Sequence, residues 1–542
     1  MQKRIITIFI VVIMVIGLLA ACGDRNTGSS ASNQTVSGNF NPTGYPIVNE
    51  EIVFTLGWFG DRDYMSEDPL DTFAWKKFYE LTNMRFEVDF INESDDGTAA
   101  NLWFAAMDYP DITLGGWPFT QARIDTYAVE GGLFEDWTPL INEWMPNLKS
   151  LMDTEPMILP TIRQMNGKIY TLPQLSKSST DYTGYHFYRT DYLDELNITE
   201  ATTIDGFYDN LKAVMDAGLT NGKAPFLPYT DGGMQNQHMR THVMDFFFPA
   251  FGPGIDWQWG DNGDGKVVLN AISDQYRLTL EFLNKLFVDG LLDNEVFSMD
   301  IDSMYSRINT GEVFVSTVFH TIRPEDFPAN DGTVHVSAYS PLTSQYQNTK
   351  RIIGVPMVST WCGALNINSQ YKNEIARWMD IAFAQEEVAP GTGIDRLTMS
   401  WGIEGINYNL VDGTLVWAFE SDLPWQYLRQ NIAWGTIIGD RRLLALGTDP
   451  NNFAREYAMV NKLGPYNVPF FPNLQIKHTQ EETDAISTNL TDMTLYILEE
   501  QAKFIAGTRP FTDWDDYVNT IQNMQLIKIT EAKQAAYDRW NE

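Results

Sequence analysis

The sequence is poor in cysteine, histidine and basic side chains. It has two cysteines, Cys22 and Cys362, and six histidines in 542 residues. Two cysteines allow at most one disulfide, and the histidines lack the HExxH spacing of a zinc site. Lysine and arginine number 37 against 71 aspartate and glutamate, a formal charge of −34. Such a charge repels nucleic acid and anionic headgroups, and it opposes a strongly anionic ligand unless a local basic pocket exists.

Long apolar runs are also scarce, and the most prominent one lies at the amino terminus. Lys3 and Arg4 precede an apolar run over residues 5–18, and Leu19-Ala20-Ala21-Cys22 follows it. A basic end, a short apolar core and small residues before a cleavage site predict a signal peptide over residues 1–21. The run is too short for a confident membrane span.

Leu19-Ala20-Ala21-Cys22 resembles the lipobox of bacterial lipoproteins. The resemblance implies that the mature chain begins at Cys22, carries acyl chains on it, and is held at the outer face of the cell membrane. Cys362 then has no disulfide partner. The alternative is an ordinary cleaved signal with an incidental cysteine. Residues 22–46 are rich in Gly, Ser, Thr and Asn, a composition typical of a flexible tether.

The remaining chain is long enough for two or three domains. Its first part alternates between strand-like and helix-like segments. We expect strands over residues 51–56, 85–90 and 110–114, with helices over 72–82 and 99–107 between them. This order predicts a parallel sheet with helices on its faces, and ligands in such sheets lie beyond the carboxyl ends of the strands. Gly57-Trp58 and Gly116-Trp117 mark two of these ends.

Further elements are predicted along the rest of the chain. They are an edge strand at 167–173, a helix over 205–217 with Thr203 as N-cap, a hairpin turn at 261–266, a helix over 274–289, and at least two helices in 481–540 broken at 507–510. A calcium loop is the alternative at 261–266, but the acidic pattern that it needs is missing.

Eight phrases in this chain resemble those of extracellular solute-binding proteins of sugar importers. They include GKIYTLP at 167–173, YRTDYLDEL at 188–196 and WGIEGINY at 401–408, and the others lie at 105–112, 284–295, 502–507, 514–518 and 536–540. They occur in the same order as in that family and extend from about residue 50 to the end. The sequence therefore resembles the long, Gram-positive form of the ABC-transporter substrate-binding lipoproteins of the sugar type.

The resemblance implies an α/β fold of two lobes, like that of periplasmic binding proteins, with a hinge, an interlobe cleft and a helical C-terminal extension. We expect residues 47–180 in the first lobe, with a returning segment near 320–370, and 181–542 in the second. It also implies that ligand closes the lobes, and that the protein delivers the ligand to ABC permease subunits in the membrane. Some long members carry a calcium loop after the helix matching 205–217. Here residues 218–223 hold no acidic ligand, so no metal and no cofactor are expected.

Sugars expose apolar C–H faces and hydroxyl rims, so aromatic rings and polar side chains bind them together. The aromatic candidates are Trp58, Trp117, Trp257, Trp259, Trp361, Trp401 and Tyr170. The polar candidates are Asp61, Asp111, Arg189 and Glu404. Glu404 lies between two glycines, which predicts a tight loop with its side chain exposed. Each candidate has a structural alternative: packing for the aromatic rings, a cap, turn or loop role for Asp61 and Asp111, and an ion pair with Asp191 for Arg189. The number of tryptophans favours an oligosaccharide.

Two other classes of function stay open at this point. A secreted glycoside hydrolase also uses carboxylates in an aromatic cleft, and a chain with 71 acidic residues always offers some suitable pair. A peptide-binding lipoprotein or a surface adhesin is the other alternative. No Gly-x-Ser-x-Gly elbow and no phosphate loop occur. We therefore expect a binding protein rather than an enzyme.

Overall fold

A computed structural model describes most of the chain after residue 37. The described residues are 38–59, 65–91, 98–115, 120–176, 186–228, 243–261, 263–316, 335–354, 358–411, 414–419, 421, 424–434, 440–441, 445–446, 462–468, 471–472 and 476–542. Residues 41–542 form one compact unit. Cys22 and the segment around it lie outside the described residues.

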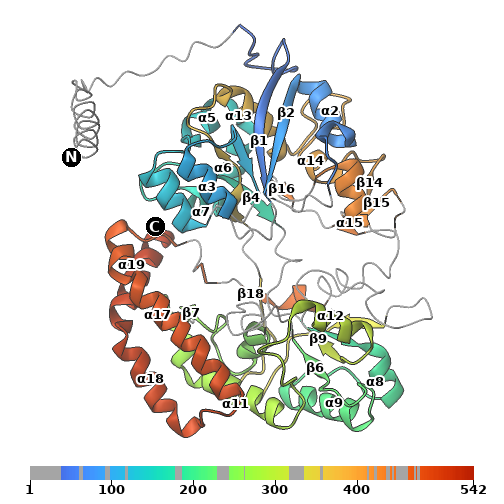
Figure 1. Ribbon diagram of the computed structural model, residues 1–542, viewed down its shortest axis with the longest axis vertical. Helices are drawn as coiled ribbons and strands as arrows, with labels where there is room; N and C mark the ends of the chain where they lie inside the picture. The colour runs from blue at the N-terminus through green and yellow to red at the C-terminus, as the bar shows by residue number, and fades with distance from the viewer. Residues whose placement is uncertain are drawn as a thin grey trace, which may run out of the picture. The chain divides into compact units, whose positions relative to one another are not determined.

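The predicted parallel sheet is confirmed. Strand β1 (Ile52–Phe59) pairs in parallel with β2 (Met84–Ile91) on one side and β3 (Ile112–Leu114) on the other (Figure 1). A fourth strand, β13 (Ala364–Leu365), adds to β3 in the antiparallel direction, so the order is β13-β3-β1-β2. The predicted helices between the strands are α2 (Phe73–Thr82) and α3 (Thr98–Ala106).

Helices cover both faces of this sheet, as predicted. On one face, Phe54 and Phe86 pack against Trp75 of α2 and Trp378 of α13 (Lys372–Asp380). On the other face, a Cβ atom added to Gly57 would lie 2.8 Å from the Trp103 ring of α3. The alternation of side chains along β1 therefore separates a tryptophan-rich core from the α3 layer.

More of the chain returns to the first sheet than the expected segment near 320–370. Besides β13 and α13, helix α14 (Thr398–Trp401) packs against α2, and the ring of Trp434 contacts Trp58. We call residues 41–176 and 358–434, where described, the first lobe. The predicted boundaries assigned residues 371–434 to the other lobe, whereas their contacts are with the N-terminal elements.

A second sheet has the order β10-β5-β9-β6. Its strands are β5 (Phe187–Arg189), β6 (Phe226–Leu227), β9 (Val315–Ser316) and β10 (Val336–Ala338). Its helices are α8 (Thr190–Leu196), α9 (Ile204–Asp216), α11 (Asp274–Val288) and α12 (Ile301–Asn309). The Thr203 side chain caps α9 by accepting from the Gly206 N–H, as predicted. We call residues 186–353 and 462–542, where described, the second lobe.

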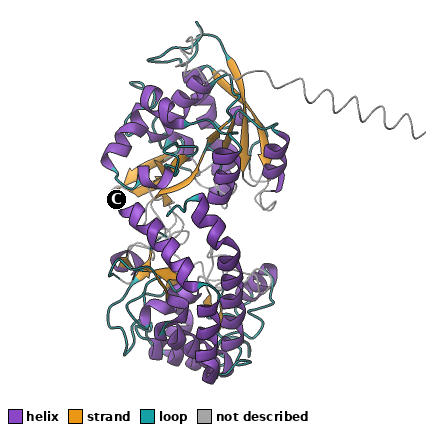
Figure 2. Ribbon diagram, turned by 90° about the vertical axis from the view of Figure 1, so that its left-hand side faces the viewer, coloured by secondary structure: helices purple, strands orange, loops and turns teal. Residues whose placement is uncertain are grey.

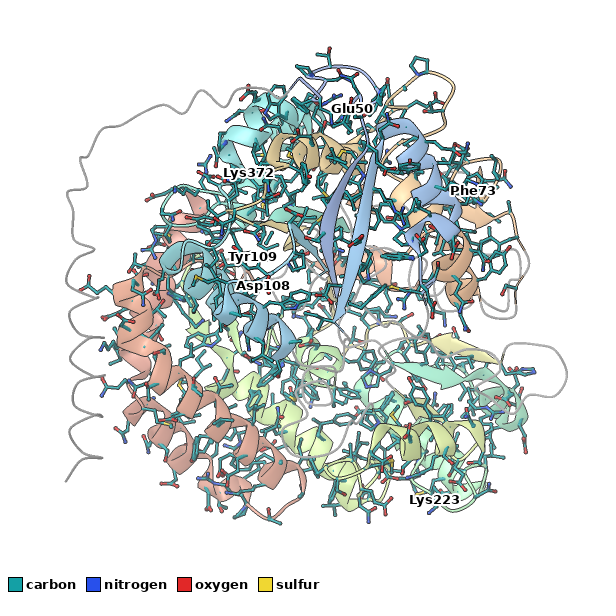
Figure 3. The ribbon with its side chains drawn as sticks, turned by 45° about the horizontal axis from the view of Figure 1, so that its top comes forward. Glu50, Phe73, Asp108, Tyr109, Lys223 and Lys372 are labelled. Carbon is teal, nitrogen blue, oxygen red and sulfur yellow. The ribbon has the colours of Figure 1, made fainter. Side chains whose placement is uncertain are left out.

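The hairpin predicted at 261–266 is also present. Strands β7 (Trp259–Gly260) and β8 (Val268–Leu269) pair in the antiparallel direction on either side of it. After α9, the chain turns through Gly218 and Gly222, both at positive φ, and Lys223 in this turn is labelled in Figure 3. Among the described residues, no cluster of three His, Cys, Asp or Glu side chains could hold a metal ion.

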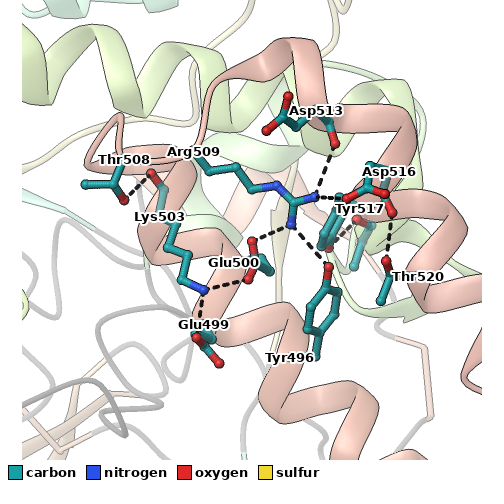
Figure 4. A network of polar contacts seen from close by, with 11 residues as sticks. Tyr496, Glu499, Glu500, Lys503, Thr508, Arg509, Asp513, Asp516, Tyr517 and Thr520 are labelled. Atoms are coloured by element: carbon teal, nitrogen blue, oxygen red, sulfur yellow. Dashed lines mark hydrogen bonds and ion pairs between the residues drawn. The ribbon is translucent and has the colours of Figure 1, made fainter.

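The C-terminal region is helical, as predicted, and consists of α17 (Gln480–Ile505), α18 (Trp514–Asn523) and α19 (Leu526–Asn541). Arg509 lies in the break between α17 and α18 and donates to the Glu500 carboxylate (2.5 Å), the Tyr496 hydroxyl (3.1 Å) and the Asp516 carboxylate (2.9 Å) (Figure 4). Because Glu500 is buried, this network fixes the angle between the two helices from inside.

Three short strands lie in one sheet near the places where the chain passes between the two lobes. They are β4 (Leu172–Ser176), β12 (Val358–Cys362) and β16 (Asp440–Arg441), with β4 in the middle. Strand β17 (Ala445–Leu446), which follows β16, still pairs with β15 (Thr414–Trp417) of the first lobe. The edge strand expected at 167–173 is thus displaced toward β4, and residue 169 makes only an isolated bridge to residue 163. We call this sheet the crossover sheet.

Shorter elements complete the described structure, and Figure 2 shows the helices, strands and loops together. They are η2 (Pro69–Asp71), α4 (Gln121–Arg123), η4 (Ile124–Glu130), α5 (Trp137–Trp144), α6 (Pro146–Thr154), α7 (Ile158–Ile162), η5 (Phe248–Ala250), η6 (Asn270–Ile272), β11 (Ile352–Ile353), η8 (Ile381–Phe383), β14 (Tyr408–Val411), β15 (Thr414–Trp417), α15 (Pro424–Tyr427), η9 (Leu428–Ile432), β17 (Ala445–Leu446), η12 (Gly464–Tyr466), β18 (Asn467–Val468) and η13 (Phe511–Asp513). Within the part of the chain that is described, none of the helices has the length and apolar character to cross a bilayer.

Candidate functional site

The carboxyl ends of β1, β2 and β3 are the place where the fold predicts a ligand. Trp58 and Phe90 lie side by side there as paired residues of β1 and β2, and Leu114 of β3 pairs with Trp58 from the other side. The predicted site residues Asp61 and Trp117 follow these strands and lie outside the described residues.

Trp58 belongs to the core in this structure. Its side chain has 0% exposure, and its ring makes an edge contact with Trp434, whose centroid lies 5.6 Å away. Trp434 also contacts Phe90 at 5.2 Å and Trp75 at 6.3 Å. The Trp58 ring therefore offers no face to a ligand in this conformation, and its role in binding stays a prediction.

Trp103 is a half-buried ring that the sequence argument missed. It lies against Gly57, where a Cβ atom would come within 2.8 Å of the ring. A glycine inside a strand often marks the close approach of another group. The Gly57-Trp58 pair was interpreted as a sign that Trp58 is functional, whereas the glycine makes room for Trp103.

Asp111 immediately precedes β3, near the start of the strand predicted over 110–114. The Asp111 carboxylate accepts from the Thr55 N–H (2.8 Å) and the Thr55 hydroxyl (2.9 Å), and the Asp111 N–H donates to the same hydroxyl oxygen (2.9 Å). Asp108 and Tyr109, labelled in Figure 3, lead into this position from α3. The contacts of Asp111 hold β3 in register with β1, a structural role that differs from the cap or turn considered as its alternative, and its role in binding stays a prediction.

Tyr170 and Arg189 also have structural partners. Tyr170 is buried among the α3 and η4 side chains, and its hydroxyl accepts from the Asn166 amide at 3.0 Å. Arg189 is buried and donates from Nε to the Asp191 carboxylate at 2.9 Å, so the ion pair considered as its alternative is confirmed. The Arg189 guanidinium also lies 4.4 Å from the centroid of the Tyr192 ring.

Trp257 and Trp259 are buried in the second-lobe core. Trp257 stacks on Tyr276 of α11 with an interplanar angle of 16°, and Lys533 of α19 lies 5.0 Å from the Trp259 ring centroid. Asp256 precedes them, and burial raises its pKa to about 6, against the effect of the Gln258 and Trp259 backbone N–H groups. These contacts bind the 256–259 loop to the C-terminal helices, and a ligand role for the two rings stays a prediction.

Trp361 is described only by its backbone, which lies in β12 of the crossover sheet. The sequence argument expected a segment crossing between lobes here, and β12 is such a segment. Cys362, the next residue, is buried and forms no disulfide in the described structure.

Trp401 and Glu404 lie in one tight loop of the first lobe. Gly402 has φ +89°, and a Cβ atom there would lie 2.3 Å from the Asn407 side-chain oxygen, which accepts from the Ile403 N–H at 2.9 Å. A side chain is therefore excluded at Gly402. Glu404 is exposed at the tip of the loop, as predicted for a residue between two glycines. Trp401 is buried beneath it.

A series of aromatic rings leads from Trp401 to the surface. Trp417 lies 5.4 Å from Trp401, Phe419 lies 4.9 Å from Trp417, and Tyr427 stacks on Phe419 at 4.7 Å between centroids. Exposure increases along the series from 4% for Trp401 to 39% for Tyr427. We call Phe419 and Tyr427 the aromatic platform. Trp417 ends β15 and Phe419 follows it by two residues, a spacing that could have indicated the platform.

The carboxylates of Asp395 and Glu404 act on each other and on Tyr408, which pairs with Trp417 between β14 and β15. Burial raises the pKa of Asp395, and the negative charge of Glu404 raises it further, against the Leu397 N–H and Arg396. Burial also raises the pKa of Tyr408, with Asp395 and Glu404 acting in the same direction. Exposed ring faces near a carboxylate can stack on sugar C–H groups and accept from sugar hydroxyls. Of the sequence-predicted residues whose side chains the structure describes, Trp401 and Glu404 alone lie in this part of the first lobe.

No family model matches the chain. The fructooligosaccharide ABC transporter substrate-binding protein FusA of Streptococcus pneumoniae serotype 4 is 24% identical over 97% of this chain and 96% of its own length. The S. pneumoniae FusA structure in complex with kestose covers 90% of this chain and 99% of its own, with a TM-score of 0.68 and 20% identity. A solute-binding protein from Bifidobacterium longum infantis that binds HMO covers the same shares with a TM-score of 0.69 and 15% identity.

These likenesses extend over nearly the whole of each protein, so both lobes and the C-terminal helices belong to the shared architecture. They confirm the fold class expected from the sequence, a mixed helix and sheet structure with a helical C-terminal region. The chain is a homologue of the ABC-transporter substrate-binding proteins and has the two-domain fold of those that bind sugars.

Proposed function

We propose that this protein is the substrate-binding lipoprotein of an ABC importer and captures an oligosaccharide outside the cell. The observation that carries the proposal is the relation to FusA over 97% of the chain. The ligand passes unaltered to permease subunits in the membrane. Cys22 holds the protein at the outer face of the cell membrane through acyl chains, and residues after it act as a tether.

The first lobe supplies the aromatic platform and Glu404 to the ligand. Phe419 and Tyr427 stack on sugar rings, and the Glu404 carboxylate accepts from hydroxyls at their rim. Trp103 and Phe90, both half-buried at the carboxyl ends of β1 and β2, are further candidates for contact. Asp61 and Trp117 keep their predicted roles at the same edge of the sheet.

The charge of the protein favours a neutral ligand. A chain with a formal charge of −34 repels a polyanion such as a uronic-acid oligomer, and the carboxylates of Glu404 and Asp395 add to this near the platform. Neutral oligosaccharides, of which kestose bound to FusA is an example, meet no such repulsion.

Closure of the lobes is the mechanism by which binding becomes a signal. The crossover sheet holds β4 and β12, which border two of the passages of the chain between the lobes. A ligand that contacts both lobes stabilises the closed form and shifts the population toward it. The permease then recognises the closed form.

Calorimetric titration with neutral oligosaccharides tests the proposal. Kestose, nystose, a human-milk tetrasaccharide and a uronic-acid trimer are each titrated into the purified mature chain, and the mixtures are then analysed for new products. We expect saturable binding of a neutral oligosaccharide, weaker or no binding of the uronic acid, and unchanged ligand after incubation. Time-dependent hydrolysis would instead establish an enzyme, and peptide binding without sugar binding would establish the third alternative.

A further inference from the structure

Lys477 places a buried ammonium group at the carboxyl end of α7 in the first lobe. Its Nζ donates to the carbonyl oxygens of Thr161 (2.6 Å), Pro160 (3.3 Å) and Arg163. The last carbonyls of a helix have no partner within it, and a cation is favoured at that end. An ammonium with three donors therefore satisfies three carbonyl groups that α7 leaves open.

The backbone of Lys477 belongs to the second lobe. Ile476 is buried in the second-lobe core, and the Lys477 carbonyl accepts from the Arg539 guanidinium of α19 at 3.1 Å. Arg539 also pairs with Glu482 in the first turn of α17, and Thr479 caps that helix. The residue is thus fixed to the start of α17 and to α19, while its side chain is inserted in the first lobe.

The contact lies beside the crossover sheet. Helix α7 packs against β4 and β12, the two strands of the crossover sheet that border passages of the chain between the lobes (Figure 1). When two bodies turn about an axis, points near the axis move little and points far from it separate. A contact beside the crossover strands can therefore persist over a range of opening angles, and it resists rotation that would separate its partners beyond that range.

Two charged groups of the first lobe face Lys477. The carboxylate of Asp125 in η4 attracts it, and the guanidinium of Arg163 repels it. Asp125 accepts from the Gln121 amide, which also donates to the Gln164 side-chain oxygen at 2.7 Å. The ammonium therefore enters an ordered polar pocket built by α4, η4 and the end of α7.

We propose that Lys477 is a pivot between the lobes, a positioning residue that limits how far they open. The inserted ammonium holds the start of α17 against α7 while the rest of the second lobe turns on the crossover sheet. The effect on capture rests on the proposed function, but the effect on lobe opening in the ligand-free protein does not.

The test compares Lys477→Met with the intact chain. Methionine has an unbranched apolar side chain close in length to the lysine stem, but it removes the charge and all three donors. We expect a larger radius of gyration of the ligand-free chain by X-ray scattering, and faster amide exchange in residues 158–164 and 476–482. A smaller closed fraction reduces apparent affinity in proportion, so we expect oligosaccharide binding to weaken about threefold or more.

Lys503→Met is the matched control, because Lys503 lies in α17 and pairs only with Glu499 and Glu500 of the same helix. It should leave the scattering and the exchange of residues 158–164 unchanged. Lys477→Arg, which keeps charge and donors, should restore part of the wild-type behaviour.

If a folded Lys477→Met chain shows the scattering and amide exchange of the wild type, the pivot proposal is wrong, whatever the sugar affinity of the variant. If Lys477→Met does not fold, the same measurements are made on Lys477→Gln, which keeps one donor group and has no charge. The result expected and the result that overturns the proposal are the same for this variant. If the wild-type chain binds no sugar, the proposed function fails, and scattering of the ligand-free chains still decides the pivot.

Discussion

Tyr427 is the residue whose environment best suits contact with a sugar. Its ring is 39% exposed and its inner face is supported by Phe419 at 4.7 Å, so the outer face is held in place without being covered. We expect Tyr427→Ala to weaken oligosaccharide binding by about 1–3 kcal/mol, the cost of losing a stacked ring in base–aromatic contacts. Calorimetric titration measures this, and thermal unfolding should change little.

Tyr346 provides the control for Tyr427. It is also exposed, at 53%, and lies near Phe251 in the second lobe, away from the aromatic platform. Tyr346→Ala should leave affinity unchanged. Equal affinity losses in the two variants, or none in either, would contradict the assignment of the platform.

Substitution of Trp58 distinguishes a role of this ring in packing from a role in ligand binding. Because it is fully buried against Trp434, we expect Trp58→Ala to lower the free energy of unfolding by about 3–5 kcal/mol, as large-to-small changes in cores do. Denaturant unfolding measures this. A variant of wild-type stability that has lost sugar binding would show that Trp58 acts on the ligand after all.

At the scale of the residue, the sequence predicted contacts between chain neighbours better than it predicted which side chains the tertiary fold covers. It indicated that Glu404 is exposed between glycines and that Arg189 can pair with Asp191, since both follow from nearest neighbours along the chain. It could not distinguish Trp103 from Trp58, because which ring is covered depends on the return of Trp434 to the first lobe. The tertiary fold decides which of the 16 tryptophans has an open face.

At the scale of the element, periodicity was sufficient where elements are long. The sheet of β1, β2 and β3, helices α2, α9 and α11, and the C-terminal helices were all predicted, since each has a clear period or cap. Strands of two residues, such as β13 and β16, have no period to detect, and only pairing with distant segments makes them strands. For this reason the crossover sheet and the return of residues 371–434 were not predicted.

The network around Arg509 sets the joint between two C-terminal helices. Arg509→Met removes the donors to Glu500, Tyr496 and Asp516, and leaves the buried Glu500 carboxylate with Lys503 at 2.8 Å. We expect a loss of about 1–3 kcal/mol in the free energy of unfolding, less than the 3–5 typical of breaking a buried pair because Lys503 remains. Arg277→Met, which breaks an exposed pair with Glu281, should cost about 0.3–0.5 kcal/mol. Equal losses in the two variants would contradict this.

At the scale of the whole molecule, Lys477 makes stability depend on pH. Burial lowers the pKa of Lys477 to about 7 from its usual 10.5, with Asp125 opposing and Arg163 adding to the shift. Between these values the unfolded chain binds more protons than the folded one, so this group makes stability rise with pH, by up to about 1.4 kcal/mol per unit. Below pH 7 both states are protonated and the dependence ends.

Denaturant unfolding at pH 7, 8 and 9 measures this effect as a difference between the wild type and Lys477→Met. Burial also lowers the pKa of Lys533 to about 8, but both chains retain that group, so the difference isolates Lys477. The wild type should gain stability relative to the variant as pH rises. A constant difference across this range would mean that the Lys477 ammonium keeps its ordinary pKa when the protein is folded.

In the proposed lipoprotein, the length of the tether sets how far the folded body can move from the membrane. The compact unit begins at Asn41, and Arg377 of α13 donates to the Asn41 and Gly44 carbonyls, so the tether proposed at 22–46 ends earlier than expected. Residues 22–40 span at most about 65 Å when fully extended, which keeps the body within reach of a permease in the same membrane.

We expect Cys22→Ser to move the protein from the membrane fraction of a Gram-positive host to the medium, with unchanged thermal unfolding and sugar affinity, since Cys22 precedes the compact unit. A variant that stays with the membrane in high salt would show that something other than acylated Cys22 retains the protein there.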